Sequence, residues 1–85
     1  MSDTKEIQTA LNDGKLIIGT DRVMKGLKDG SMKKVFVTSN APDVVKEDVS
    51  HYSKLSGAEI VFLDATNEEI KELCKKPFNI SLVGI

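Results

Sequence analysis

Apolar residues recur along the chain in two different patterns, and together these predict an alternation of helices and strands. Apolar positions three or four residues apart are typical of one face of a helix, whereas short runs of consecutive apolar residues are typical of buried strands. The first pattern predicts helices over residues 3–11, 20–28, 42–56 and 66–75. The second pattern predicts strands over residues 15–19, 33–39, 59–63 and 80–85.

Residues that favour turns and helix caps stand at the expected boundaries. Asn12-Asp13-Gly14 and Asp29-Gly30-Ser31 should end the first two helices. Pro42 stands in the first turn of the third helix, where proline is tolerated. Thr66, followed three residues later by Glu69, forms a capping box that should open the fourth helix.

Short connections between alternating helices and strands predict a central, largely parallel sheet with helices on both faces. The expected architecture is a three-layer α/β/α sandwich, formed by one domain over residues 1–85. No apolar run reaches the roughly 18 residues that a membrane span needs, and residues 1–6 lack the apolar core of a signal peptide. We therefore expect the protein in the cytoplasm.

The net charge is only −1, but the charges are unevenly distributed. Residues 15–34 carry six basic and two acidic side chains, whereas the net charge is −2 over residues 1–14 and −3 over residues 35–85. Binding to a polyanion depends on the local potential, so a basic segment on a weakly acidic protein is compatible with nucleic-acid binding. The alternative interpretation is a solvated charged surface without a partner.

The sequence contains no arrangement of residues typical of an enzyme. Residues 19–25 are similar to a phosphate-binding loop but lack its second glycine, and Gly26 stands where that loop has serine or threonine. Cys74 and His51, the only residues of their kinds, fall on different predicted helices, and one cysteine supplies neither a disulfide nor a zinc site. We therefore expect no catalytic activity, no metal and no cofactor.

The second predicted helix begins at a turn suited to binding phosphate. Gly19 ends a predicted strand, and the free backbone N–H groups of the helix that follows attract anions. Arg22 and Lys25 lie three residues apart and so share a helical face. The turn that contains Asn40 follows the next strand and belongs to the same edge of a parallel sheet. Asn40 either hydrogen-bonds a base edge with its amide or stabilises its own turn.

Several segments, in this order and spacing, resemble a known family. They are Gly-Lys-Leu-Ile-Ile-Gly at 14–19, Lys25, Lys-Lys-Val-Phe-Val-Thr-Ser-Asn-Ala-Pro at 33–42, Lys-Glu-Asp-Val-Ser-His-Tyr-Ser-Lys-Leu-Ser-Gly at 46–57, and Glu-Leu-Cys-Lys-Lys-Pro-Phe-Asn-Ile-Ser-Leu-Val-Gly-Ile at 72–85. Over nearly its whole length, the chain resembles the archaeal and eukaryotic large-subunit ribosomal proteins of the thirty-e type, which belong to the kink-turn RNA-binding superfamily. The resemblance implies an α/β/α sandwich with a mixed four-stranded sheet, in place of a largely parallel one.

The resemblance also implies a function. Proteins of this family bind the sharply bent internal loop of a kink-turn in rRNA through three adjacent loops, as structural parts of the large ribosomal subunit and without catalysis. By position, these loops carry here Gly19, Thr20, Asp21, Arg22 and Lys25; Asn40 and Ala41; and Lys76, Pro77 and Phe78. Many relatives have an Asn-Glu pair where this chain has Asp21 and Arg22. The implied partners are RNA and neighbouring ribosomal proteins, with no membrane, and we expect a monomer in the free state.

Other functions stay open beside this one. The first is a kink-turn protein that acts outside the ribosome, and the second, from a different class, is a small α/β module that binds a protein or a ligand. Phe78 likewise has two interpretations. Its ring either packs against the sheet edge and closes the core, or faces outward near Asn40 and Lys25 and stacks on an unpaired base.

Overall fold

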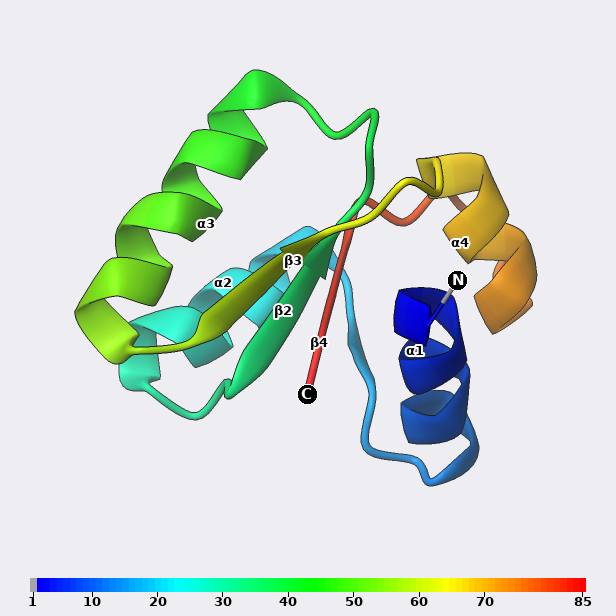
Figure 1. The fold of residues 1–85 in the computed structure, drawn as a ribbon, viewed down its shortest axis with the longest axis horizontal. Helices are drawn as coiled ribbons and strands as arrows, with labels where there is room; N and C mark the ends of the chain where they lie inside the picture. The colour runs from blue at the N-terminus through cyan, green and yellow to red at the C-terminus, as the bar shows by residue number, and fades with distance from the viewer. Residues whose placement is uncertain (1) are drawn as a thin grey trace.

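The computed structural model describes residues 2–85, and the side chains of residues 5–85. The helices are α1 (Ser2–Asn12), α2 (Thr20–Asp29), α3 (Asp43–Ser56) and α4 (Asn67–Cys74). The strands are β1 (Ile17–Ile18), β2 (Lys34–Val37), β3 (Glu59–Phe62) and β4 (Leu82–Gly84). Their order along the chain agrees with the order predicted from the sequence (Figure 1).

The four strands form one mixed sheet in the order β1-β4-β2-β3. β2 and β3 are parallel, and β4 runs antiparallel to both β1 and β2. The mixed sheet is therefore confirmed, and the largely parallel sheet predicted from alternation is wrong. The reason lies in the segment after α4, which returns to the first residue of that helix. There the Ile80 N–H donates to the Asn67 carbonyl at 3.4 Å, so β4 starts at the sheet edge where the other strands end.

Apolar side chains on the two faces of the sheet form two separate layers. On β2, Val35 and Val37 pack with Val23 and Leu27 of α2 and with Val49 of α3. The residues packed on the opposite face include Ile7, Phe36, Ile70, Cys74, Ile80 and Val83, contributed by α1, α4, the α4–β4 segment and the sheet. Figure 1 shows α2 and α3 on one side of the sheet and α1 and α4 on the other, which confirms the α/β/α sandwich.

Local capping confirms several of the predicted boundaries. The Thr66 hydroxyl accepts a hydrogen bond from the Glu69 N–H at 3.3 Å, which is one of the two bonds of the predicted capping box. Gly30 and Gly57 adopt the left-handed conformation immediately after α2 and α3. The fourth helix ends one residue earlier than predicted, because Lys75 takes a left-handed conformation with φ 55°. None of the helices in residues 2–85 is both long and apolar enough to span a bilayer.

Lys34 joins α1 to the sheet through ion pairs. Its ammonium lies 2.8 Å from a Glu6 carboxylate oxygen and 3.4 Å from a Glu59 carboxylate oxygen. The hydrogen bond to Glu6 raises the pKa of Lys34, and the bond to Glu59 adds to the effect. Since Glu6 and Glu59 lie far apart in the sequence, this contact fixes the position of α1 against the middle of the chain.

The topology brings the connecting loops to one edge of the sheet. β1, β2 and β3 run in the same direction and end at this edge, and the antiparallel β4 begins there. The N-terminal ends of α2, α3 and α4, which follow these strands directly, therefore lie along the same edge. Helix N-termini carry partial positive charge, so this edge is the part of the fold best suited to bind an anion.

Candidate nucleic-acid interface

A hollow of about 600 Å³ opens at the β1 end of this edge. Its lining combines most of the residues predicted to bind RNA with two apolar side chains that form part of its wall. The predicted residues are Gly19, Thr20, Asp21, Arg22, Lys76 and Phe78, and the apolar ones are Leu16 and Ile18. Two loops far apart in the sequence, the β1–α2 turn and the α4–β4 segment, thus form a single concave surface.

The turn into α2 depends on Gly19. Its φ of 115° lies in the region that favours glycine. A Cβ atom at this position would meet no atom within 4 Å, so the restriction comes from the backbone and not from crowding. The Gly19 N–H donates to the Leu82 carbonyl at 3.3 Å. Gly19 therefore keeps the chain bonded to β4 while α2 turns away from the sheet.

The first N–H groups of α2 are free to bind a ligand. The Val23 N–H makes the first hydrogen bond of the helix, to the Gly19 carbonyl at 3.0 Å. No side chain caps this end of α2 within the described part of the chain. The N–H groups of Thr20, Asp21 and Arg22 precede that first bond and need an acceptor from water or a ligand. A phosphate oxygen in the hollow would satisfy them.

Basic side chains outnumber acidic ones in the lining of the hollow. Arg22 and Lys76 contribute positive charge, and Asp21 contributes the negative charge. All three residues are exposed. Asp21 lies in the first turn of α2, where a carboxylate also stabilises the helix through its dipole. The net positive charge and the helix N-terminus act in the same direction and favour an anionic ligand.

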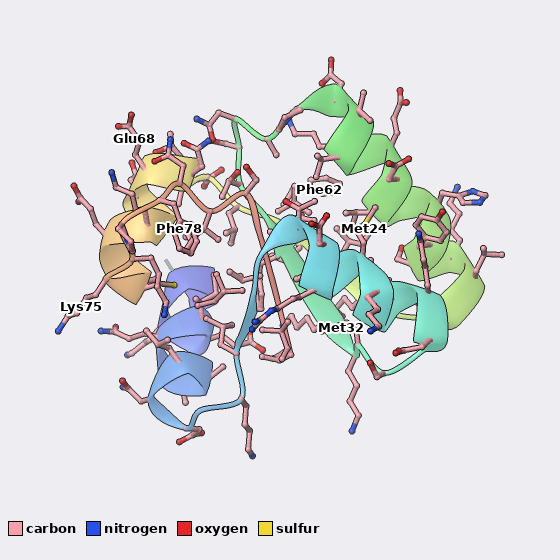
Figure 2. The ribbon with its side chains drawn as sticks, turned by 180° about the vertical axis from the view of Figure 1, so that it is seen from behind. Met24, Met32, Phe62, Glu68, Lys75 and Phe78 are labelled. Carbon is pink, nitrogen blue, oxygen red and sulfur yellow. The ribbon has the colours of Figure 1, made fainter. Side chains whose placement is uncertain are left out.

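Phe78 gives the hollow an exposed aromatic side. It is 53% exposed and belongs to the lining, so it does not close the core. Figure 2 shows its ring on the segment that follows α4, with Lys75 at the end of the helix. The left-handed conformation of Lys75 turns the chain so that Lys76 and Phe78 approach α2. Phe78 thus faces outward, as one of the two interpretations predicted. Its neighbours in the hollow are Gly19–Arg22, whereas that interpretation had placed it near Asn40 and Lys25.

Asn40 is engaged by the protein itself. Its Oδ1 accepts a hydrogen bond from the Asn67 N–H at 2.8 Å, and its Nδ2 donates to Asn67 Oδ1 at 3.2 Å. The pair satisfies an N–H group at the start of α4 and connects the β2–α3 loop to that helix. This contact favours the structural interpretation of Asn40, although one Nδ2 hydrogen stays available for a ligand.

The remaining predicted residues lie outside the hollow. Ala41 is 5% exposed and packs in the core, so only its backbone is available to a ligand. Lys25 is exposed one turn beyond Arg22. Hydrogen bonds from Ser31 lower the pKa of Asp29, and the charge of Lys25 adds a smaller contribution in the same direction. Pro77 is exposed between Lys76 and Phe78.

Leu16, Ile18 and Asn67 are parts of this region that the sequence did not reveal. The apolar run that contains Leu16 and Ile18 predicts a buried strand, but β1 is an edge strand and both side chains are only partly buried. Asn67 could have been suspected from its place directly after the Thr66 cap, where its N–H needs an acceptor. Its partner lies 27 positions away, and local sequence does not indicate a contact at that distance.

The described residues offer no set of three or more histidine, cysteine or acidic side chains placed to hold a metal ion. Cys74 is buried in the layer between α4 and the sheet, and its burial raises the pKa of the thiol. A buried thiol with a raised pKa is a poor nucleophile. The groups that line the hollow offer charge, hydrogen-bond donors and acceptors, and aromatic surface.

Comparison with solved structures supports the fold. A structure described as "The structure of a protein with unknown function from Bacillus halodurans C" superposes with a TM-score of 0.85. The match covers 96% of this chain and 81% of the other, at 15% sequence identity. At this identity the likeness concerns the fold alone.

Sequence comparison gives the family. The large ribosomal subunit protein eL30 of Sulfolobus acidocaldarius is 39% identical over 80 residues, which cover 94% of this chain and 77% of that protein. The eL30 protein of Methanothermobacter thermautotrophicus is 35% identical over 85 residues, covering 100% and 87% of the two chains. The family model described as "Ribosomal protein L7Ae/L30e/S12e/Gadd45 family" matches residues 2–85. The chain therefore belongs to the ribosomal protein L7Ae/L30e/S12e/Gadd45 family.

Proposed function

We propose that this chain is an RNA-binding structural constituent of the large ribosomal subunit and that it recognises a kink-turn in rRNA. The observation that carries the proposal is the hollow beside α2, where free backbone N–H groups, Arg22, Lys76 and the exposed ring of Phe78 meet. The names of the eL30 relatives support the ribosomal part of the proposal. The protein would then act in the cytoplasm, where it contacts rRNA and adjacent ribosomal proteins, and it would act without catalysis.

The hollow has the groups that a sharply bent RNA requires. A bend brings backbone phosphates of the two strands close together, and their repulsion opposes the bent state. The α2 N-terminus, Arg22 and Lys76 would offset that repulsion by binding phosphate oxygens. A bend also exposes unstacked bases, and the ring of Phe78 offers a surface on which one base can stack.

Rigid loops make the bound geometry of the RNA specific. Gly19 bonds the β1–α2 turn to β4, and the Asn40–Asn67 pair bonds the β2–α3 loop to α4. These contacts hold the loops before RNA arrives, so little loop entropy is lost on binding. The protein should consequently select RNA that already adopts the bent form, or stabilise that form once it appears.

A titration against two RNAs tests the proposal. One RNA contains a kink-turn, and the control is an uninterrupted duplex of the same length and end sequences. We expect clearly tighter binding to the kink-turn at every salt concentration, with a salt dependence that reports the phosphate contacts. Equal affinity for both RNAs would refute kink-turn recognition. Retention on ribosomes that have been washed at high salt then separates a ribosomal constituent from a free kink-turn protein.

A further inference from the structure

β3 is the edge strand on the side of the sheet away from β1 and the hollow. Its outer side carries backbone groups that do not pair with another strand within residues 2–85. Among the described residues, β3 pairs with β2 alone. The N–H groups of Glu59 and Leu63 donate to carbonyls on the β2 side at 3.0 and 2.7 Å. Successive residues of a strand point to opposite sides, so the N–H and C=O groups of Ile60 and Phe62 face outward. An edge of this kind is a template for a further strand.

Exposed apolar side chains accompany these backbone groups. Phe62 is 58% exposed on β3, and Ile60, two residues before it on the same face, is partly exposed. A hollow of about 460 Å³ between Phe62 and α3 is lined by Lys46, Glu47, Ser50, His51 and Lys54. Figure 2 shows Phe62 and Phe78 on separate parts of the molecule. Phe62 belongs to the edge strand β3, and Phe78 lies near the other edge strand, β1.

The charges around this edge disfavour RNA as its ligand. The charged residues of α3, β3 and the position after Leu63 are Asp43, Lys46, Glu47, Asp48, Lys54, Glu59 and Asp64. Two bases stand against five acids, and Glu59 also contacts Lys34 of β2, which leaves this surface with a net charge of −2. A polyanion would be repelled. A second copy of this chain carries the same net charge, so it can associate only in a register that sets the bases of each copy against acids of the other.

Glu47 and Lys54 make the surface complementary to itself. They lie seven residues apart, about two turns of helix, and therefore share one face of α3. Among the described side chains, the ion pairs within 4.0 Å involve Lys34, so Glu47 and Lys54 have no ion-pair partner within residues 5–85. If two α3 helices lie antiparallel around a two-fold axis midway between these residues, Glu47 of each copy faces Lys54 of the other. The same patch then serves both copies.

The strand geometry leads to the same axis. Outward-facing residues must pair with each other in an antiparallel ladder, and an axis at Val61 sets Ile60 of one copy opposite Phe62 of the other. From Glu59, Val61 lies roughly 7 Å along the strand. α3 ends at Ser56, shortly before β3 begins at Glu59. Counted back from Ser56 towards the start of α3, the same distance of roughly 7 Å corresponds to about four to five residues, which reaches the region midway between Glu47 and Lys54. One axis therefore satisfies the backbone groups, the apolar side chains and the charges together.

We propose that two copies of this chain associate through β3 and α3 around this axis and form one continuous sheet. This inference does not depend on RNA binding. α3 packs over β2 and β3 through Val49 and its neighbours, so joining the sheets brings the two α3 helices to about the 8–10 Å at which helices pack. The hollows that contain Phe78 stay open at the two outer ends. The association departs from the monomer expected from the sequence.

Sedimentation equilibrium over a wide range of protein concentration tests the proposal. We expect the average mass of the wild type to rise from that of one chain, 9.3 kDa, towards twice that value. Phe62→Glu should abolish the rise, because it places a carboxylate opposite Ile60 in each half of the interface. Phe78→Glu is the matched control: it changes a similarly exposed ring near β1, at the other edge of the sheet, and should leave association unchanged. Thermal melts check that both variants fold.

Charge exchange tests the position of the axis. Glu47→Lys alone and Lys54→Glu alone each replace two attractive pairs by two repulsive ones and should raise the dimer Kd by about tenfold. An equimolar mixture of the two variants should recover wild-type association, since every contact in the mixed dimer is again between opposite charges. A wild type that stays monomeric, a dimer that survives Phe62→Glu, or a mixture that associates no better than its components would overturn the proposal.

Discussion

Replacing Phe78 by leucine separates a role in RNA binding from a role in the core. The ring is 53% exposed, so slightly less than half of its surface is covered. A phenylalanine offers roughly 200 Å², and the covered part therefore amounts to about 90 Å². At about 25 cal/mol per Å² this contact stabilises the fold by about 2 kcal/mol at most. Leucine keeps most of the contact, so Phe78→Leu should lower the free energy of unfolding by less than about 1 kcal/mol.

The expected effect on RNA is larger and of a different kind. Leucine lacks the flat ring on which a base can stack, and loss of stacking costs about 1–3 kcal/mol. The Kd for the kink-turn RNA should therefore rise by about 5- to 150-fold. Because no charge changes, the slope of log Kd against log salt should stay the same. Titrations at several salt concentrations and a urea unfolding curve supply the two measurements.

Phe62→Leu is the matched control for this experiment. Phe62 is 58% exposed, so the same substitution removes a similar ring from the opposite edge of the sheet. It should leave the affinity for RNA unchanged. The reasoning fails if Phe78→Leu and Phe62→Leu change the affinity equally. It also fails if Phe78→Leu lowers the free energy of unfolding by the 3–5 kcal/mol typical of losing a fully buried ring while RNA binding is unaffected.

Further expectations concern the neighbouring positions on α2. Lys25→Ala should leave stability unchanged, because the side chain is exposed, and should reduce the salt slope by about one if Lys25 binds a phosphate; an unchanged slope excludes that contact. Asp21→Asn removes a carboxylate from the hollow, so the Kd for RNA should stay the same or fall, and a large rise would reveal a specific bond made by Asp21. A Cβ at Gly26 would lie 2.6 Å from Met32 Cγ, so Gly26→Ala should destabilise the wild type by about 1 kcal/mol. In a Met32→Ala background the same change should stabilise by about 0.5–1 kcal/mol, and chemical unfolding of the wild type, the two single variants and the double variant checks this reversal of sign.

The helices and their ends follow closely from the sequence because they depend on local interactions. Thr66 and Glu69 lie within one helical turn, and their hydrogen bond forms as predicted. Arg22 and Lys25 are exposed because helical spacing sets them apart from the apolar face of α2. The outward orientation of Phe78 was one of two predicted interpretations, and burial decided between them.

The strand directions and the tertiary side-chain contacts could not be derived in this way. Alternation predicts neighbouring strands but does not show that the chain doubles back between α4 and β4, because Ile80 reaches Asn67 through tertiary folding. The pairing of Asn40 with Asn67 and of Lys34 with Glu6 joins residues 27 and 28 positions apart. No local period indicates such contacts, and they decide which loops are rigid.

A net charge of −1 is compatible with RNA binding because the charges lie on separate surfaces. Arg22 and Lys76 line the hollow at the β1 edge, whereas the acidic surface around α3 and β3 lies at the other edge of the four-stranded sheet. Three strand spacings amount to about 14 Å, which exceeds the Debye length of about 8 Å at physiological salt. The acids at β3 therefore contribute little to the potential at the hollow. Glu47→Lys should accordingly weaken self-association and leave the affinity for RNA nearly unchanged at physiological salt. A marked gain in RNA affinity would show that the two surfaces are not independent.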